Sequence, residues 1–433
     1  MKKSEAGKKR NSISSLILSF FAVLVYIILL WSLFKPLAGQ LMFSGPDEKG
    51  LFFAIDFNRN NAASHYILGR QYHFSLNSHD MKKAISHYRE SLSLIPLQAA
   101  VWTDLAKAYQ IAGQPSESER SLERAVRLNP NNPDLMWEAG TFWLINNMTD
   151  KAMGSLKRYI QLMPENQNIA YDLCYRLRLD NNYLLANLVP DSYNFRASYL
   201  TYLINTNRLE EAEETWKTIG LKRLDKKLFI AYVNFLINNS QYEKAETLWK
   251  EITGKIDGYV KDSPLFLMSN YSFENDMLEG GFDWIISETN GVNVFIDGTV
   301  HMEGKRSLAV TFDGKTNPDI AFARQVVRVA PASKYVLMAN IKTDGITTTN
   351  GISMSVQGHK CSGLNKSSET VTGTNFWKEL SIDFDVPAQC SAVTVNFKRE
   401  RSVKFDNRIQ GTAWLDKVTM KQQIVQTAGS ARP

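Results

Sequence analysis

Hydrophobic positions follow three different patterns along the chain. Residues 13–34 are almost wholly apolar, residues 61–257 repeat apolar positions at helical spacing, and residues 264–422 carry short alternating or β-branched runs. An unbroken apolar run predicts a membrane helix, a period near 3.6 predicts amphipathic helices, and a period of two predicts strands. We therefore expect a transmembrane helix, an all-α region and an antiparallel β region, with a linker at 35–60 and a flexible tail at 423–433.

The first apolar segment has the length of a membrane span. No charged residue lies between Asn11 and Phe34, and as a helix residues 13–34 would be about 33 Å long, against roughly 30 Å for the hydrocarbon core of a bilayer. A cleaved signal peptide is the alternative, but its apolar stretch usually runs about 7–15 residues. The sequence therefore favours an uncleaved signal-anchor.

Charge predicts how this segment is oriented. Residues 1–12 hold five basic side chains, whereas the twenty residues after the apolar run carry only Lys35 and Lys49 as cations. Because positive flanks stay on the cytoplasmic side, we expect a cytoplasmic amino terminus. The bulk of the chain would then lie beyond the membrane, most simply in a bacterial periplasm, with the protein held in the inner membrane by one span.

The helical region contains a fixed repeat. Pro96, Pro130 and Pro164 are 34 residues apart, which is the period of the tetratricopeptide repeat. Residues 99–132 resemble that repeat at its signature positions, which are Trp102, Leu105, Ala106, Tyr109, Leu122, Ala125 and Pro130.

The repeats extend over about six units. Residues 203–219 and 236–252 match each other closely, and residues 167–192 form a degenerate unit interrupted by Pro190. The resemblance implies a solenoid of stacked helical pairs whose groove binds a protein partner. Its signature positions are core positions, so they name no partner-binding residue. Cys174 stands at such a position, which favours an inert buried thiol.

The last third of the chain predicts an antiparallel β-sandwich. Short strand-like runs are separated by turn residues at regular spacing, which is typical of that architecture. The predicted strands are Val292–Ile296, Ser307–Phe312, Phe322–Val329, Tyr335–Lys342, Gly351–Val356, Leu380–Val386, Val393–Arg399 and Ala413–Met420.

A second resemblance lies in the order of motifs across this region. Residues 270–274 (NYSFE) open it, residues 281–284 (GFDW) and 304–308 (GKRSL) follow, and residues 414–418 (WLDKV) close it. This order is similar to the jelly-roll carbohydrate-binding modules of families 4 and 9 and covers residues 264–422. Ala332 departs from the family, which usually has Gly there.

The resemblance implies two kinds of site. A structural calcium would join the first and last strands through Glu274 and Asp416, since calcium takes several oxygen ligands; alternatively, both carboxylates are ordinary solvated or capping groups. Carbohydrate would be bound by exposed aromatic and polar side chains, for which the candidates are Trp284, Arg324, Gln357 and Arg399. The polar candidates could equally decorate a strand, and Trp377 and Trp414 match core positions of the family.

Two cysteines of the sandwich region are candidates for a disulfide. Cys361 and Cys390 lie in the same predicted domain, and in an oxidising compartment they should pair and close a loop worth about 3–3.5 kcal/mol. Two free buried thiols are the alternative. The predicted orientation of the membrane segment favours the disulfide.

Composition and motifs exclude several function classes. The net charge of +6 comes largely from the amino-terminal cluster, so it does not indicate nucleic-acid binding. The sequence contains no phosphate-binding loop, nucleophile elbow or HExxH pair, and we expect no catalytic residue and no cofactor besides the calcium.

Three functions remain, in decreasing order of support. The first is a non-catalytic membrane-anchored periplasmic scaffold that binds a protein through its repeats and a glycan through its sandwich. This combination resembles accessory proteins of bacterial exopolysaccharide synthesis and export. The second is a pure protein-interaction adaptor whose sandwich binds no carbohydrate, and the third is a glycan-modifying enzyme.

Overall fold

The computed structural model describes residues 20–32, 34, 48–57, 60–77, 79–219 and 225–423. The basic tail, the first part of the predicted membrane segment, most of the linker and nearly all of the predicted carboxyl-terminal tail lie outside these residues. Residues 20–32 are helical, and large apolar side chains such as Phe21 and Trp31 are exposed on them. Across the described ranges, no helix combines the length and the apolar character that crossing a bilayer requires.

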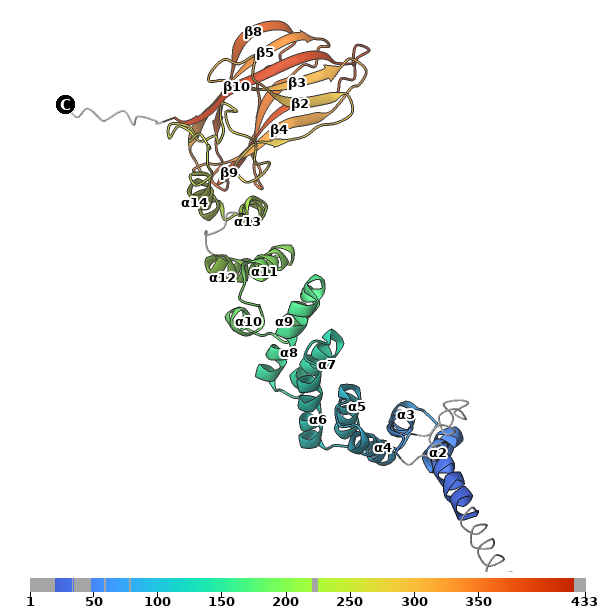
Figure 1. The fold of residues 1–433 in the computed structure, drawn as a ribbon. Coiled ribbons are helices and arrows are strands. Elements are labelled where there is room, and N and C mark those ends of the chain that lie inside the picture. Colours follow the sequence, from blue (N-terminus) through green and yellow to red (C-terminus); the bar gives the residue numbers. More distant parts are fainter. Residues whose placement is uncertain are drawn as a thin grey trace, which may run out of the picture. The chain divides into compact units, whose positions relative to one another are not determined.

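Helices follow one another in antiparallel pairs up to residue 253 (Figure 1). One helix, α2 (Glu48–Phe57), precedes them. The pairs are α3 (Ala62–Phe74) with α4 (Met81–Leu94), α5 (Ala99–Ile111) with α6 (Pro115–Leu128), α7 (Pro133–Ile145) with α8 (Thr149–Leu162), α9 (Gln167–Arg176) with α10 (Asn181–Asn187), α11 (Tyr193–Asn205) with α12 (Leu209–Ile219), and α13 (Lys226–Asn238) with α14 (Tyr242–Thr253).

Local sequence explains where these helices begin and how closely they pack. The side chains of Asn61, Asp80 and Asn132 each accept a hydrogen bond from a backbone N–H of the first turn, at 3.1 Å, which satisfies a donor that the helix itself leaves free. Gly140 lies against Leu156 so closely that a Cβ there would come within 2.6 Å of it. Small residues therefore allow the two helices of a pair to touch.

The fourth pair is shorter than the others. Helix α10 spans only Asn181–Asn187 and ends ahead of Pro190, because proline removes a backbone donor and clashes with the preceding turn. This is the unit that the sequence marks as degenerate.

The contacts divide the chain into two compact units, residues 1–195 and residues 196–433. The second unit contains most of α11 (Tyr193–Asn205) and all of α12–α14 together with the sandwich, so the last helices belong structurally with the β region rather than with the earlier repeats. The linear division near residue 260 marks a change of secondary structure and not the edge of a unit.

Two five-stranded antiparallel sheets form the sandwich, which confirms the predicted succession of a helical repeat region and a β-sandwich. The first sheet has the order β1-β4-β9-β6-β7, and the second has the order β2-β3-β10-β5-β8 (Figure 1). The strands are β1 (Ile285–Ile286), β2 (Val292–Asp297), β3 (Ser307–Asp313), β4 (Ile320–Arg328), β5 (Lys334–Ile346), β6 (Ser353–Gly358), β7 (Asn365–Ser367), β8 (Gly373–Asp385), β9 (Ala392–Arg399) and β10 (Gln410–Gln422).

All eight predicted strands are present, and the two that the sequence did not predict are the short β1 and β7. Alternate residues of the longer strands enter one core between the sheets, for example Val393, Val395 and Phe397 of β9. The intervening residues face outward, so each sheet also presents an outer face that could bind a ligand.

Candidate functional site

Trp284 is part of the core and not a glycan platform. Its side chain is fully buried, its Nε1 donates to the carbonyl oxygen of Asn270 at 3.2 Å, and its ring lies 5.4 Å from that of Phe273 and 5.9 Å from that of Phe397. A sugar could not reach this ring. The prediction that Trp284 contacts carbohydrate is therefore wrong, because the preceding Gly-Gly turn buries the indole.

Arg399 is likewise a structural residue. The side chain is fully buried, and its guanidinium donates to the carbonyl oxygens of Pro318 at 2.6 Å and Asn407 at 2.9 Å and to the side chain of Asn317. It thereby ties two loops to the end of β9. Its predicted contact with a glycan is also wrong, since all these donors are directed into the protein.

Arg324 and Gln357 do share a surface, the outer face of the first sheet. Arg324 of β4 is paired with Asn396 of β9, which is paired in turn with Ser355 of β6, and Gln357 lies one row further on. Arg324 and Gln357 are exposed, whereas Asn396 and Ser355 form a nearly buried polar floor between them. None of these positions holds an aromatic ring.

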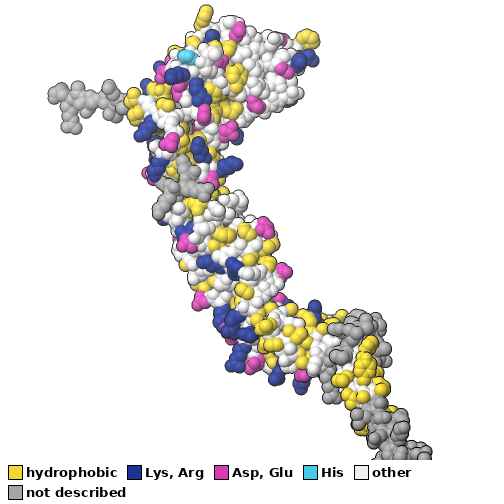
Figure 2. Space-filling view, in the orientation of Figure 1, with side chains coloured by type: hydrophobic (Ala, Val, Ile, Leu, Met, Phe, Trp, Pro, Cys, Tyr) yellow, Lys and Arg dark blue, Asp and Glu magenta, His cyan; other side chains and the backbone are white. Residues whose placement is uncertain are grey.

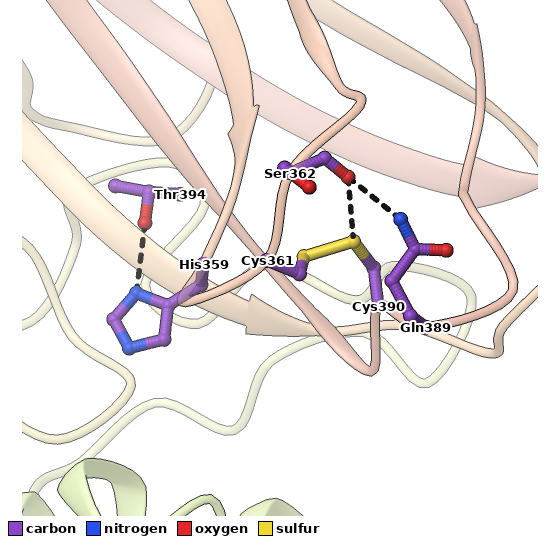
Figure 3. Close-up of a disulfide and its surroundings, with 6 residues drawn as sticks. All are labelled: His359, Cys361, Ser362, Gln389, Cys390 and Thr394. Atoms are coloured by element: carbon purple, nitrogen blue, oxygen red, sulfur yellow. Dashed lines mark hydrogen bonds between the residues drawn. A yellow bond between two sulfur atoms is a disulfide. The ribbon is translucent and has the colours of Figure 1, made fainter.

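Helix α14 (Tyr242–Thr253) packs beside one end of this polar face. The Tyr242 ring meets His359 edge-on, with ring centroids 5.9 Å apart, and Glu246 accepts a hydrogen bond from Arg328 at 2.8 Å. Burial lowers the pKa of His359, and its Nδ1 lies 3.0 Å from Oγ1 of Thr394 (Figure 3). These contacts join the last helical pair to the sandwich.

The favoured disulfide is present beside these residues. Cys361 and Cys390 are bonded, and Gln389 donates to the carbonyl oxygen of Ser362 at 2.9 Å across the same loop (Figure 3). The bond connects the loop after β6 to the turn before β9. Cys174 is buried in α9, and burial raises the pKa of its thiol to about 12, as expected for an unreactive core cysteine.

The outer face of the second sheet carries the exposed aromatic rings that the first sheet lacks. Strand register places Phe295 beside Ala309, Ala309 beside Trp414, and Trp414 beside Lys342. Trp377 lies at the bulge of β8 opposite Lys342. We call Phe295, Trp414 and Trp377 the aromatic row; it crosses five strands, a distance of about 19 Å.

Polar neighbours fix the central ring of this row. Nε1 of Trp414 donates to the carboxylate of Asp297 at 2.8 Å, and the Lys342 ammonium lies 5.4 Å from the ring centroid. Hydrogen bonds from Thr299 above all, and also from Trp414, lower the pKa of Asp297 to about 2, so this acceptor stays ionised. The indole is thus held in place while part of its face remains accessible, as stacking on an apolar ligand face requires.

The resemblance placed Trp377 and Trp414 in the core, and the structure corrects both to half-buried positions. Alternation along β10 could have shown this for Trp414, because its neighbours Ala413 and Leu415 both enter the core and the residue between them must face outward.

Glu274 and Asp416 have similar roles, because each carboxylate accepts hydrogen bonds from backbone N–H groups of residues 302–306. Asp416 is fully buried and accepts hydrogen bonds from Ser272 and from the N–H groups of Met302, Glu303 and Lys417, at 2.7–3.0 Å. Glu274 accepts from the N–H groups of Lys305 and Arg306 at 2.8 and 2.9 Å. Four donors fill the Asp416 oxygens, so this residue does not fit a directly bound cation.

The two carboxylates instead clamp the turn at residues 302–306 between the opening segment and the last strand. Throughout the described parts of the chain, no group of three or more His, Cys, Asp or Glu side chains is arranged to hold a metal ion. The calcium site stays a prediction, and the four hydrogen bonds already accepted by the Asp416 carboxylate argue against it.

Comparison with known proteins identifies one repeat by its sequence. Residues 99–132 match the family model for the tetratricopeptide repeat. No curated protein matches the chain. Residues 99–132 are therefore a tetratricopeptide repeat, in agreement with the signature residues and with the α5–α6 pair that they form.

Similar solved structures cover parts of the chain. A family 61 carbohydrate-binding module in complex with β-1,4-galactotriose is 17% identical and covers 36% of this chain and 99% of its own, with a TM-score of 0.27. A family 4 module has the same identity, coverage and TM-score. YrrB, a tetratricopeptide-repeat protein with an unusual peptide-binding site, is 18% identical and covers 48% of this chain and 93% of its own, with a TM-score of 0.25. At TM-scores this low, the fold assignment rests on the chain's own helices, strand order and register.

Proposed function

We propose that this chain is a non-catalytic, membrane-anchored scaffold of the bacterial envelope. Its repeats bind a protein partner, and the aromatic row of its sandwich binds a polysaccharide in exopolysaccharide or other envelope assembly. The resemblance to accessory proteins of exopolysaccharide systems supports this setting, and the uncharged stretch of residues 13–34 supports the anchor.

The observation that carries the glycan function is the aromatic row. Three aromatic side chains lie on one outer face, and the central indole is preset by Asp297 and Lys342. A ring held in advance loses little conformational entropy when a ligand stacks on it. The polar face around Asn396 offers hydrogen bonds without a stacking surface, so it is the weaker of the two glycan candidates.

Affinity electrophoresis of the full chain in detergent, in gels containing neutral and anionic polysaccharides, tests this function. We expect one polysaccharide to retard the protein and Trp414→Ala to weaken that retention about tenfold or more, as truncating an aromatic anchor does. Trp414→Phe should keep most of the retention, and Arg324→Ala on the polar face should keep all of it. Absence of retention on every polysaccharide would instead support the adaptor function.

A fusion experiment tests the proposed location. Alkaline phosphatase joined after Gln40 should be active only if that end of the chain is exported, because the enzyme needs an oxidising compartment to fold. The same fusion made after Arg10, ahead of the apolar stretch, is the control and should be inactive. Equal inactivity of both fusions would overturn the periplasmic location.

The absence of catalysis is part of the proposal and has its own test. The full chain, incubated with the polysaccharide that retards it, should release no reducing ends over background. Release that a single carboxylate substitution abolishes would show a glycan-modifying enzyme.

A further inference from the structure

A groove of about 1010 Å³ runs between α4 (Met81–Leu94) and α6 (Pro115–Leu128), with α5 (Ala99–Ile111) as its floor. These are the second helices of two successive pairs and the first helix of the later pair. Figure 2 shows Lys and Arg side chains gathered over α4 and α6. We call this feature the basic groove.

The rim of the basic groove is strongly cationic. Its charged residues recur at intervals of three, four or seven along each helix, which places them on one helix face. Five are cations and one is a carboxylate, and all six are exposed: Lys82, Arg89, Arg120, Arg124, Arg127 and Glu117.

Most of this positive charge is not neutralised. Within the described ranges Glu117 pairs only with Arg120, at 3.3 Å, and this pair is largely solvated. Lys82, Arg89, Arg124 and Arg127 form no ion pair with another residue among those that the structure describes. An anionic partner would therefore find four free cations, whose attraction falls as salt is added.

The next pair of second helices provides an internal comparison. Between α6 and α8 (Thr149–Leu162), Lys151 bridges to Glu123 at 2.6 Å and also to Glu119. One repeat earlier, the positions of Glu119 and Glu123 are taken by Ile85 and Arg89. The position of Lys151 is taken by Glu117. Ile85 and Arg89 supply no carboxylate, so the cations of the basic groove lack the ion pairs that neutralise Lys151 in the next repeat.

The floor of the groove is apolar. Nε1 of Trp102 donates to the carbonyl oxygen of Pro96 at 2.8 Å, so the polar atom of the indole is already paired, and its ring lines the groove together with Ile85 and Leu105. Trp102 and Ile85 are half-buried and contribute accessible apolar surface. A ligand that complements both the cationic rim and the apolar floor needs carboxylates that reach the rim and apolar side chains that contact the floor.

We infer that the basic groove binds an acidic segment of a protein partner, with carboxylates on the rim cations and aliphatic or aromatic side chains on the floor. This inference deepens the proposed function, on whose protein partner it rests, by giving that partner's chemistry and binding place. A protein segment is favoured over an anionic polysaccharide because the accessible apolar surface of Ile85 and Trp102 suits aliphatic or aromatic side chains, which a uronic-acid polysaccharide lacks. Glutamate and leucine side chains together satisfy both the rim and the floor.

Fluorescence anisotropy on the full chain in detergent tests the inference, with a labelled short peptide of Glu and Leu as the probe. The peptide should bind, and Arg89→Glu with Arg124→Glu should weaken binding about tenfold or more. The matched control, Arg176→Glu with Lys227→Glu, makes the same charge change at exposed sites outside the groove and should leave affinity unchanged. Ile85→Gln should weaken binding of the Glu/Leu peptide through the floor.

Two further probes separate the sources of binding. A Gln/Leu peptide should bind more weakly than the Glu/Leu peptide, and polygalacturonate should not displace the latter. Arg89→Gln with Arg124→Gln, checked by thermal melting, covers the case in which charge reversal disturbs folding. Unchanged affinity in the groove variants, or displacement of the peptide by polygalacturonate, would overturn the inference. The phosphatase fusion and the polysaccharide gels would still decide the scaffold function by themselves.

Discussion

The basic groove of the repeats and the aromatic row of the sandwich are opposite kinds of surface. In the repeats, most aromatic and small signature residues pack helix against helix, with the half-buried Trp102 as an exception, and the exposed helix faces carry charge. In the sandwich, strand alternation sends every second residue outward, so rings such as Trp414 reach the surface although their neighbours form the core. An aromatic residue therefore does not reveal by its type whether it lies in the core, as Trp284 does, or at the surface, as Trp414 does in part.

The two regions also differ in what holds them together. A repeat contacts mainly its sequence neighbours, and its helices are capped by nearby side chains. The sandwich joins residues far apart in the chain, through its ladders, through the Cys361–Cys390 bond and through Asp416, which binds the turn at residues 302–306. Single changes should therefore have larger and more global effects in the sandwich.

Trp284→Ala should give the largest loss of stability. Removing this fully buried ring between the sheets should cost the sandwich about 3–5 kcal/mol, seen as earlier urea unfolding and faster hydrogen exchange in β4 and β9. Trp414→Ala should cost the fold less than about 1 kcal/mol, because the ring is partly exposed, while it should weaken the proposed glycan binding about tenfold or more. If Trp284→Ala lost the glycan and kept full stability, Trp284 would be a contact residue after all.

Reduction of the disulfide should have the next largest effect. Opening the loop between Cys361 and Cys390 should lower the free energy of unfolding of the sandwich by about 3 kcal/mol, measured by urea unfolding with and without dithiothreitol. The double variant Cys361→Ser and Cys390→Ser should have the lower free energy of unfolding from the outset, and dithiothreitol should not change it. A comparable loss in the repeats, whose one cysteine is Cys174, would contradict the comparison.

Gly281→Ala tests how firmly the last helical pair belongs to the sandwich. Gly281 has a φ of 62°, and a Cβ there would lie 2.4 Å from the Trp249 ring of α14. We expect a cost of about 2–3 kcal/mol, from backbone strain together with the displaced ring. Gly345 has nearly the same φ, 61°, with open space around it, so Gly345→Ala measures the strain alone. If Gly281→Ala and Gly345→Ala lowered the free energy of unfolding equally, the contact between Trp249 of α14 and Gly281 would contribute nothing to stability.

Acid should weaken the first repeat slightly. Burial, and then the neighbouring His65, lower the pKa of His87 in α4, so the folded state takes up its proton less readily than the unfolded chain. The stability that His87 contributes is complete above pH 6.5 and declines as pH falls below it, by less than about 1 kcal/mol. The melting temperature of the repeats, measured from pH 7.5 to 5.5, should show this decline, and the decline should be smaller in His87→Gln. The exposed His79→Gln is the control and should leave it unchanged.

Removal of divalent cations should leave the stability of the sandwich unchanged. Because N–H groups and Ser272 occupy the oxygens of Asp416, EDTA should leave the thermal midpoint of the sandwich where it is. A midpoint that rises with added calcium and falls with EDTA would restore the calcium site and require Asp416 to exchange its present hydrogen bonds for a metal.

Much of the fold, but only part of the candidate site, could be predicted from the sequence. The repeat period and the eight main strands follow from local patterns, whereas β1 and β7 are too short to show one. The pairing of the two cysteines was favoured by the predicted compartment and not by a local pattern. The sequence suggests Trp284 and Arg399 as surface residues, because it does not show which aromatic or charged side chains the fold buries. Only Arg324 and Gln357 among the predicted glycan residues lie on a common exposed face.

The sequence by itself determined the order of the parts: an apolar amino-terminal stretch, helical repeats with a period of 34 residues, and alternating strands. Each of these is a periodic signal carried by neighbouring residues. Tertiary structure alone decided which side chains meet, because the aromatic row assembles residues 295, 377 and 414 from three strands and the basic groove assembles two helices separated by a third. Such surfaces depend on strand register and helix packing, and these are set by contacts between residues that the linear pattern leaves far apart.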